Sequence, residues 1–94
     1  MSNFVAIKKF ILRRLVRANV WGGKHVPLYY VKRGVPEFLR NSNRGKKELQ
    51  EAIRELVNDE WMFIHIKRTG KGSDVHVSLN SRKSGEIKRF LEEG

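Results

Sequence analysis

The chain has 94 residues, no cysteine and a formal net charge of +10. This length suits one domain with a single modest core and is too short for two. The absence of cysteine excludes disulfide bridges and cysteine-based zinc fingers, and no apolar run approaches the roughly 18 residues of a membrane span. We therefore expect residues 1–94 to form one soluble, cytoplasmic domain.

The positive charge is concentrated in the first half of the chain. Residues 1–47 carry twelve Lys or Arg and one acid, Glu37, whereas residues 48–94 carry eight basic and nine acidic residues. Such an excess attracts polyanions through counterion release, so the binding would weaken steeply with salt. The charge predicts a nucleic-acid partner, and an anionic membrane surface is the competing interpretation.

Residues 3–18 are predicted to form the first helix, because apolar residues recur on one stripe and cations line the opposite side. The stripe is Phe4, Ile7, Ile11, Leu15 and Ala18, an edge of Val5, Leu12 and Val16 widens it, and the cations are Lys9, Arg13 and Arg17. We expect a core helix with a solvated basic back; an amphipathic membrane helix and a dimer helix are the alternatives. Phe10 lies outside the stripe, which indicates a contact with another element or another subunit.

Residues 20–40 contain short elements separated by glycine and proline. A brief strand over residues 24–26 is expected to join a sheet, and a short helix over residues 27–33 follows it. Gly34 is a natural C-cap for that helix. One further helical turn is predicted over residues 36–40.

The central helix is predicted over residues 43–59. Its apolar residues have the i, i+3, i+4, i+7 spacing of one helix face, namely Leu49, Ala52, Ile53, Leu56 and Val57. Ser42 or Asn43 is expected to cap its N-terminus. Asn58 and Asp59 are expected to end it in a left-handed conformation before the next strand.

A β-hairpin is predicted over residues 62–79, because two segments alternate apolar and polar residues. One register satisfies three kinds of cross-strand pairing at once. It places Met62, Ile64 and Ile66 opposite Leu79, Val77 and Val75, Lys67 opposite Asp74, and His65 opposite His76. Gly70-Lys71 then forms a two-residue turn, for which a glycine at the first position favours type II′.

A last helix is predicted to follow the hairpin and to run to about Glu93. Ile87, Phe90 and Leu91 fall on one face of it, and Ser84 with Glu86 in the first turn marks a start.

The order of these elements resembles the winged helix-turn-helix domains, an α+β fold with a three-helix core and a hairpin wing, here with an added C-terminal helix. Stretches similar to a group of small archaeal winged-helix proteins are Gly23-Lys24-His25, Lys32-Arg33-Gly34-Val35-Pro36, Ala52-Ile53-Arg54-Glu55-Leu56, and Thr69-Gly70 with His76-Val77-Ser78-Leu79-Asn80. The resemblance implies binding to double-stranded DNA, with the central helix in the major groove and the hairpin over the adjacent backbone or minor groove. Such domains commonly have glycine where this chain has Asn58-Asp59-Glu60, which places a left-handed turn on a non-glycine residue.

Candidate nucleic-acid contacts lie on the central helix and the hairpin. The N-terminal half of a recognition helix reaches base edges, where Arg favours guanine and Gln favours adenine. The predicted base contacts are Arg44, Lys47, Gln50 and Arg54, the predicted phosphate contacts are Asn43 and Lys46, the predicted wing contacts are Lys67, Arg68 and Lys71, and Arg13, Arg17 and Arg40 are further candidates.

The net charge of the central helix weighs against this prediction. Residues 44–60 hold four basic and five acidic residues, and Glu51 would repel phosphate unless it accepts a bond from a cytosine amine or pairs with Lys47. An ordinary solvated helix face is therefore the alternative. Trp21, Tyr29 and Tyr30 are interpreted as core or sheet-edge residues, with base stacking as the alternative.

No catalytic, cofactor or metal site is predicted. Two facing histidines without a third placed ligand make a weak metal site, and Gly70-Lys71-Gly72-Ser73 lacks the spacing of a phosphate loop. The sequence therefore predicts a DNA-binding protein that is not an enzyme, a small transcriptional regulator either monomeric or dimeric through its first or last helix. A structural RNA-binding or ribosome-associated protein and a protein-interaction module on the same fold stay open.

Overall fold

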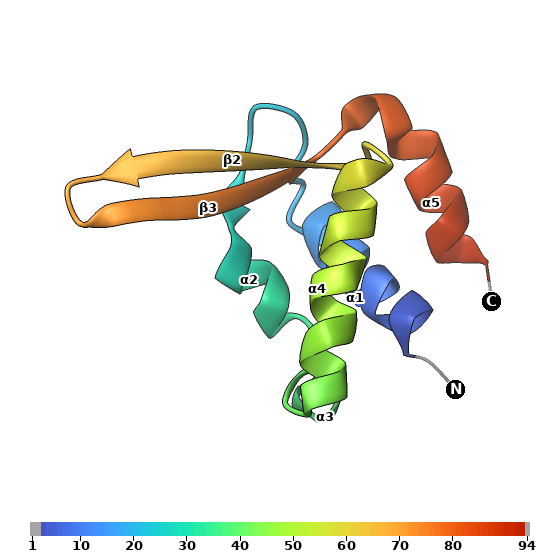
Figure 1. Ribbon diagram of the computed structural model, residues 1–94. Coiled ribbons are helices and arrows are strands. Elements are labelled where there is room, and N and C mark those ends of the chain that lie inside the picture. The colour runs from blue at the N-terminus through green and yellow to red at the C-terminus, as the bar shows by residue number, and fades with distance from the viewer. Residues whose placement is uncertain (1–2, 94) are drawn as a thin grey trace.

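The computed structural model describes residues 3–93, and within them the fold is α+β, with five α-helices and a three-stranded antiparallel sheet (Figure 1). None of the helices in this part of the chain is long and apolar enough to cross a membrane. The elements in order are α1 (Phe4–Arg17), β1 (Val26–Pro27), α2 (Leu28–Arg33), α3 (Glu37–Arg40), α4 (Asn43–Asn58), β2 (Met62–Thr69), β3 (Gly72–Leu79), the 3₁₀ turn η1 (Ser81–Lys83) and α5 (Ser84–Glu92).

The centre of the core is α1, which packs against α4, α2 and α5. Its side chains Ile7, Ile11, Leu12 and Leu15 are fully buried, and they join a cluster that includes Leu56 of α4. Each such aliphatic side chain contributes about 1.5–3 kcal/mol on burial. The prediction of a core helix is confirmed, although the residues of the predicted apolar edge separate, since Leu12 is buried and Val5 is exposed.

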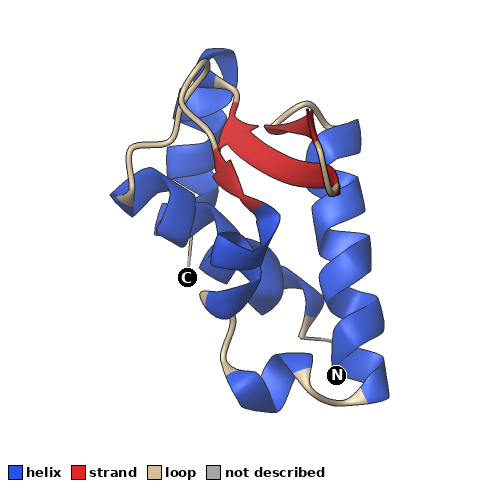
Figure 2. Cartoon of the chain, turned by 90° about the vertical axis from the view of Figure 1, so that its left-hand side faces the viewer, coloured by secondary structure: helices blue, strands red, loops and turns tan. Residues whose placement is uncertain are grey.

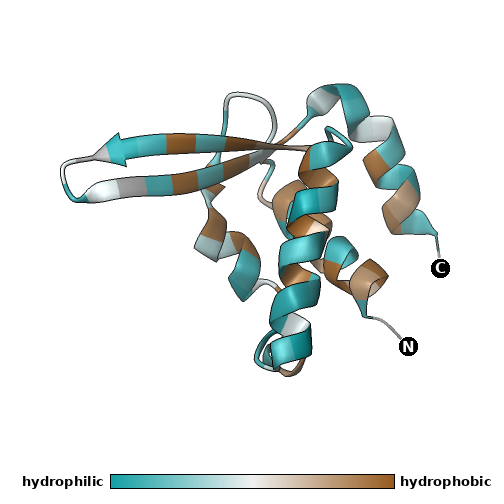
Figure 3. Ribbon diagram, viewed as in Figure 1, coloured by the Kyte–Doolittle hydropathy of each residue, from teal (hydrophilic) through white to brown (hydrophobic). Residues whose placement is uncertain are grey.

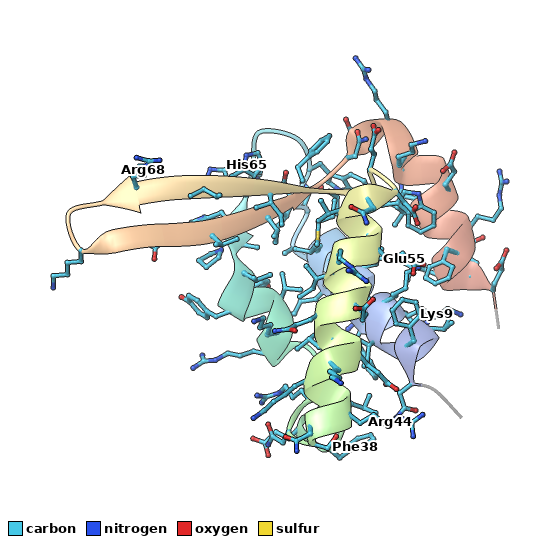
Figure 4. The ribbon with its side chains drawn as sticks, viewed as in Figure 1. Lys9, Phe38, Arg44, Glu55, His65 and Arg68 are labelled. Atoms are coloured by element: carbon cyan, nitrogen blue, oxygen red, sulfur yellow. The ribbon has the colours of Figure 1, made fainter. Side chains whose placement is uncertain are left out.

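The basic side of α1 is less solvated than predicted. Lys8 Nζ lies 2.7 Å from a carboxylate oxygen of Glu55 on α4. Lys9 Nζ donates to the backbone carbonyl of Glu93 just after α5, and Figure 4 shows Lys9 on the side of α1 nearest that helix. These two lysines therefore link α1 to its neighbours.

The corner between α3 and α4 is tight. Ser42 is the N-cap of α4, as predicted, and its hydroxyl accepts a hydrogen bond of 2.9 Å from the backbone N–H of Gly45. A Cβ atom on Gly45 would lie only 1.7 Å from the carbonyl oxygen of Leu39. The close approach of the two helices thus depends on the missing side chain.

The C-terminus of α4 does not end at the predicted left-handed residues. Asn58 is still helical and Asp59 has φ −82°, whereas Glu60 has φ +61°. The backbone N–H of Trp61 donates to the carbonyl of Leu56, which is the bond of a Schellman ending. The left-handed residue of that motif comes after the C-cap, so the turn moves one position along the chain and falls on a glutamate.

The sheet has the strand order β1-β3-β2, and the predicted hairpin register is confirmed at every pair. The first strand is Val26–Pro27, with Val26 opposite Val77. Gly70 and Lys71 form the predicted two-residue connection. The type II′ turn is wrong, because Gly72, with φ +139°, has the positive φ and Gly70 does not.

The hairpin is longer than the core that it covers, and its free end extends away from the helices (Figure 1). Apolar and polar residues alternate along both strands out toward the tip (Figure 3). At the base of the apolar face the paired residues Met62 and Leu79 are fully buried, but further out Ile64 is 43% exposed and Ile66 is 66% exposed. The outer part of this face is therefore open to a partner.

Gly45→Ala should destabilise the protein by about 1–3 kcal/mol, because the added methyl group would collide with the backbone of α3. Urea unfolding followed by circular dichroism measures the change. The matched control is Gly85→Ala in α5, where a Cβ would meet nothing within 4 Å; it should be neutral or stabilising by up to about 1 kcal/mol. Equal unfolding midpoints for the two variants would contradict the packing described at this corner.

Candidate nucleic-acid interface

The side of α4 that faces away from the core carries the predicted base contacts. Lys47 and Gln50 are exposed, and the side chains of Arg44 and Arg54 are 70% and 67% exposed. Hydrophilic residues dominate this side in Figure 3. The last helix packs on α1 and does not cover it.

The two arginines on this side pair with acids of their own helix. Arg44 Nε lies 3.1 Å from Glu48, and Arg54 pairs with Glu51. The cation that pairs with Glu51 is therefore Arg54, at i,i+3, and not Lys47, which was one of the two conditions considered for this carboxylate. Exposed pairs of this kind are worth about 0–1 kcal/mol, so a phosphate can replace the carboxylate at little cost.

A groove lies between α2, α4 and β2. It encloses about 340 Å³. Its apolar lining consists of Leu28, Ile53, Val57 and Ile64, and its polar lining consists of Lys32, Gln50, Arg54 and Asn58. Figure 2, which looks onto the left-hand side of Figure 1, shows the strands above α2 with α4 running along the right-hand side.

A second hollow continues this groove toward the N-terminus of α4. Lys32 and Gln50 line both of them. The rest of the second lining is Arg40, Asn41, Lys46 and Leu49. We call the two hollows together the α2–α4 channel. Four cations and no acid line the channel within the described residues, although α4 as a whole holds three acids beside its four bases.

The predicted contacts on the hairpin separate onto its two faces. Alternation along β2 puts Arg68 on the face of Ile64, which borders the channel. Lys67 lies on the opposite face, where it is opposite Asp74 and acts electrostatically on His25. The structure therefore removes Lys67 from the surface that faces the channel.

The nine predicted residues do not form one cluster. Figure 4 shows Arg44 near the end of α4 that is remote from the hairpin, and Arg68 near the hairpin tip. Three groups result, each exposed: Asn43, Arg44 and Lys47 at the start of α4, then Lys46, Gln50 and Arg54 along the channel, and Lys67, Arg68 and Lys71 on the outer hairpin.

Two basic residues were missed as site residues in the sequence analysis. Lys32 lines the middle of the channel, and Arg14 lines a separate hollow on α1. Lys32 could have been found, because it lies one helical turn after Leu28 on the predicted helix of residues 27–33. Arg14 depends on how α1 and α2 approach each other, which no local pattern indicates.

Three histidines gather on the outer face of the sheet. The predicted pairing of His65 with His76 is confirmed, and His25 from the loop before β1 joins them, with its Nδ1 2.9 Å from Nδ1 of His76. His65 Nε2 lies 2.9 Å from the hydroxyl of Ser78. No set of three or more ligands arranged for a metal ion is found among residues 3–93. Partial burial, followed by Lys67 and the other two imidazoles, lowers the pKa of His25.

No protein-family model, curated protein or solved structure matches this chain. Its function must therefore be inferred from the chemistry of the surfaces described above.

The lowered pKa of His25 predicts that stability falls on mild acidification. The unfolded chain takes up this proton near pH 6.5, before the folded chain does, so stability present above that pH is lost as the pH decreases toward the folded pKa. His25→Gln should reduce the difference between urea midpoints measured at about pH 7.5 and about pH 5. Comparing the two proteins at the higher pH isolates any effect of the substitution on packing. An unchanged difference would show that His25 does not titrate in this range.

Proposed function

We propose that this chain is a winged helix-turn-helix protein that binds double-stranded DNA, with α4 in the major groove and the β2–β3 hairpin as the wing. The observation that carries the proposal is the α2–α4 channel, which among residues 3–93 is lined by four cations and no acid. A surface of this kind binds the phosphates of DNA through counterion release, and this part of the affinity does not depend on the base sequence.

The element order supports the fold part of the proposal. A short helix pair, α2 and α3, leads through the Ser42 cap into the exposed helix α4, and a hairpin follows directly. In winged helix-turn-helix proteins this order places one helix in the major groove. The major groove is wide enough to admit an α-helix such as α4, which has 16 residues.

Base reading falls to Gln50 and Arg54 under this proposal. Both side chains are exposed and both line the channel, so they can contact the edge of a base that enters the channel. Gln matches the donor and acceptor pair of adenine, and Arg matches the two acceptors of guanine. Lys32, Arg40 and Lys46 then hold the backbone phosphates on either side, and Arg44 and Lys47 extend the contact past the start of the helix.

The wing contributes phosphate contacts that are independent of sequence. Arg68 is exposed near the outer end of β2, and Lys71 is in the exposed connection at the tip. The hairpin extends sideways from the C-terminal end of α4, so its tip meets the duplex at a different position from the helix (Figure 1). A role as a small transcriptional regulator is part of the same proposal.

A protein partner is the second candidate, and the apolar lining of the channel favours it. Leu28, Ile53 and Val57 are partly or fully covered, but Ile64 and Ile66 at the hairpin edge are not. An amphipathic helix seated there would bury this apolar surface. Such binding would depend weakly on salt, whereas binding to duplex DNA depends on it steeply.

Arg54→Ala should lower the affinity for the preferred duplex by about 1–3 kcal/mol and relax the choice of one base. Arg68→Ala should weaken all duplexes alike and reduce the slope of log affinity against log salt by about one. Selection from a randomised duplex pool followed by anisotropy titrations at two salt concentrations measures both effects. Arg82→Ala, on the exposed turn η1, is the control for the loss of one charge.

Equal losses from Arg54→Ala and Arg68→Ala on every duplex would remove the recognition role of α4. The same titrations with structured RNA and with single strands separate the DNA protein from an RNA-binding one. Tighter binding to structured RNA would replace the duplex DNA assignment.

A further inference from the structure

A third hollow lies between α1 and α2. It encloses about 330 Å³, at the small end of the range for ligand pockets. Five of its lining residues come from α1 and its C-cap at i, i+3, i+4, i+7 and i+8, which is one helix face: Phe10, Arg13, Arg14, Arg17 and the cap residue Ala18. Tyr30 and Gly34 close it from the side of α2. We call it the arginine hollow.

Arg14 is fixed in the wall of this hollow. Its Nε donates a 2.7 Å hydrogen bond to the carbonyl of Tyr30, and its guanidinium carbon lies 4.1 Å from the centre of that tyrosine ring. The side chain passes over Gly34, where a Cβ would lie 2.2 Å from Arg14 Cδ. Gly34 caps α2 with φ −71°, which any residue adopts, so the conformation does not require glycine there. Glycine is required there because the Arg14 side chain occupies the space that a Cβ would need.

The arginine hollow is charged without compensation. Within residues 3–93 no carboxylate pairs with Arg13, Arg14 or Arg17, and no acid lines the hollow. By contrast, the arginines on α3 and α4 each pair with a glutamate of their own helix. Three guanidinium groups on one helix face create a local field that attracts an anion more strongly than the paired arginines do.

The arginine hollow is separate from the α2–α4 channel. Tyr30 lines the hollow, whereas Leu28 and Lys32 line the channel. Residues two positions apart in a helix point in nearly opposite directions, so α2 is the wall between the two sites. A ligand in one hollow leaves the other accessible.

We propose that the arginine hollow binds a nucleoside phosphate, either a free nucleotide or the terminal nucleotide of a strand. Guanidinium groups bind phosphate oxygens through paired N–H donors, and a guanidinium already held by stacking loses little freedom on binding. The lining also contains two aromatic rings, Phe10 and Tyr30, which give a base an apolar surface to contact. This accounts for Phe10, which lies outside the apolar stripe of α1 and is only half-buried. The site does not depend on the duplex binding proposed for α4.

Calorimetric titration with ATP, inorganic triphosphate and a short 5′-phosphorylated single strand tests the proposal. The intact protein should bind ATP about tenfold more tightly than inorganic triphosphate, because only ATP has a base to place on the rings. Equal affinity for the two would overturn the nucleoside part of the proposal. If the phosphorylated strand binds and ATP does not, the ligand is a strand terminus; the reverse result identifies a free nucleotide, and binding of neither rejects the site.

Arg13→Ala/Arg17→Ala should weaken binding by about tenfold or more. The matched control is Arg82→Ala/Arg89→Ala, which removes the same charge from exposed positions on η1 and α5 and should change affinity by less than about twofold. Equal losses from the two double variants would mean that net charge alone attracts the ligand, and would overturn the site.

Gly34→Ala provides a test that leaves the charge unchanged. The new methyl group displaces Arg14 from the tyrosine ring, so affinity for the ligand should fall while the urea midpoint stays close to that of the intact protein. Full affinity in a folded Gly34→Ala protein would show that the fixed position of Arg14 has no part in binding. Duplex affinity is measured separately with Arg54→Ala, so failure of one proposal is distinguishable from failure of the other.

Discussion

The placement of the hairpin relative to α4 depends on one buried amide, Asn80. Its side-chain N–H donates a 2.7 Å hydrogen bond to the carbonyl of Glu60, its backbone N–H donates to the carbonyl of Trp61, and its side-chain oxygen caps the turn η1. Asn80 is 6% exposed, so each of these bonds is shielded from water and costly to lose. The same residue therefore fixes the left-handed end of α4, the start of β2 and the start of the last helical segment.

The distribution of acids sorts the basic surfaces of this molecule. The chain has twice as many basic as acidic residues, but the glutamates of α3 and α4 lie next to the arginines of those helices. In the part of the chain that the structure describes, no glutamate pairs with the arginines of α1 that line the arginine hollow. The sequence shows which half of the chain is basic. The structure shows in addition that the arginines of the channel, Arg40 and Arg54, are paired with glutamates, whereas among residues 3–93 those of the arginine hollow are not. Under the two proposals, these are two different kinds of anion site on either side of α2.

Local patterns in the sequence predict most of the secondary structure and little of the candidate site. The hairpin register follows from alternation, because a slip of one residue would turn Ile64 and Val77 to the wrong face. Helix ends are less predictable, since Glu60 takes the left-handed position through a backbone motif that does not select for its side chain. Arg14 illustrates the limit for function: its position beside Tyr30 depends on how α1 and α2 pack against each other, which is not encoded within a few residues.

The strand β2 is the outermost of the sheet, so along its free side it presents backbone donors and acceptors with no strand partner within the part of the chain that the structure describes. An exposed edge that carries Ile64 and Ile66 is the kind of surface on which a second polypeptide adds a strand. Lys67 and Arg68 occupy the open end of that edge, and both are exposed. When the same edge of a second molecule approaches, the positive charges on the two edges repel each other. Cations on an edge strand disfavour such edge-to-edge pairing, to which a purely apolar hairpin of this length would be open.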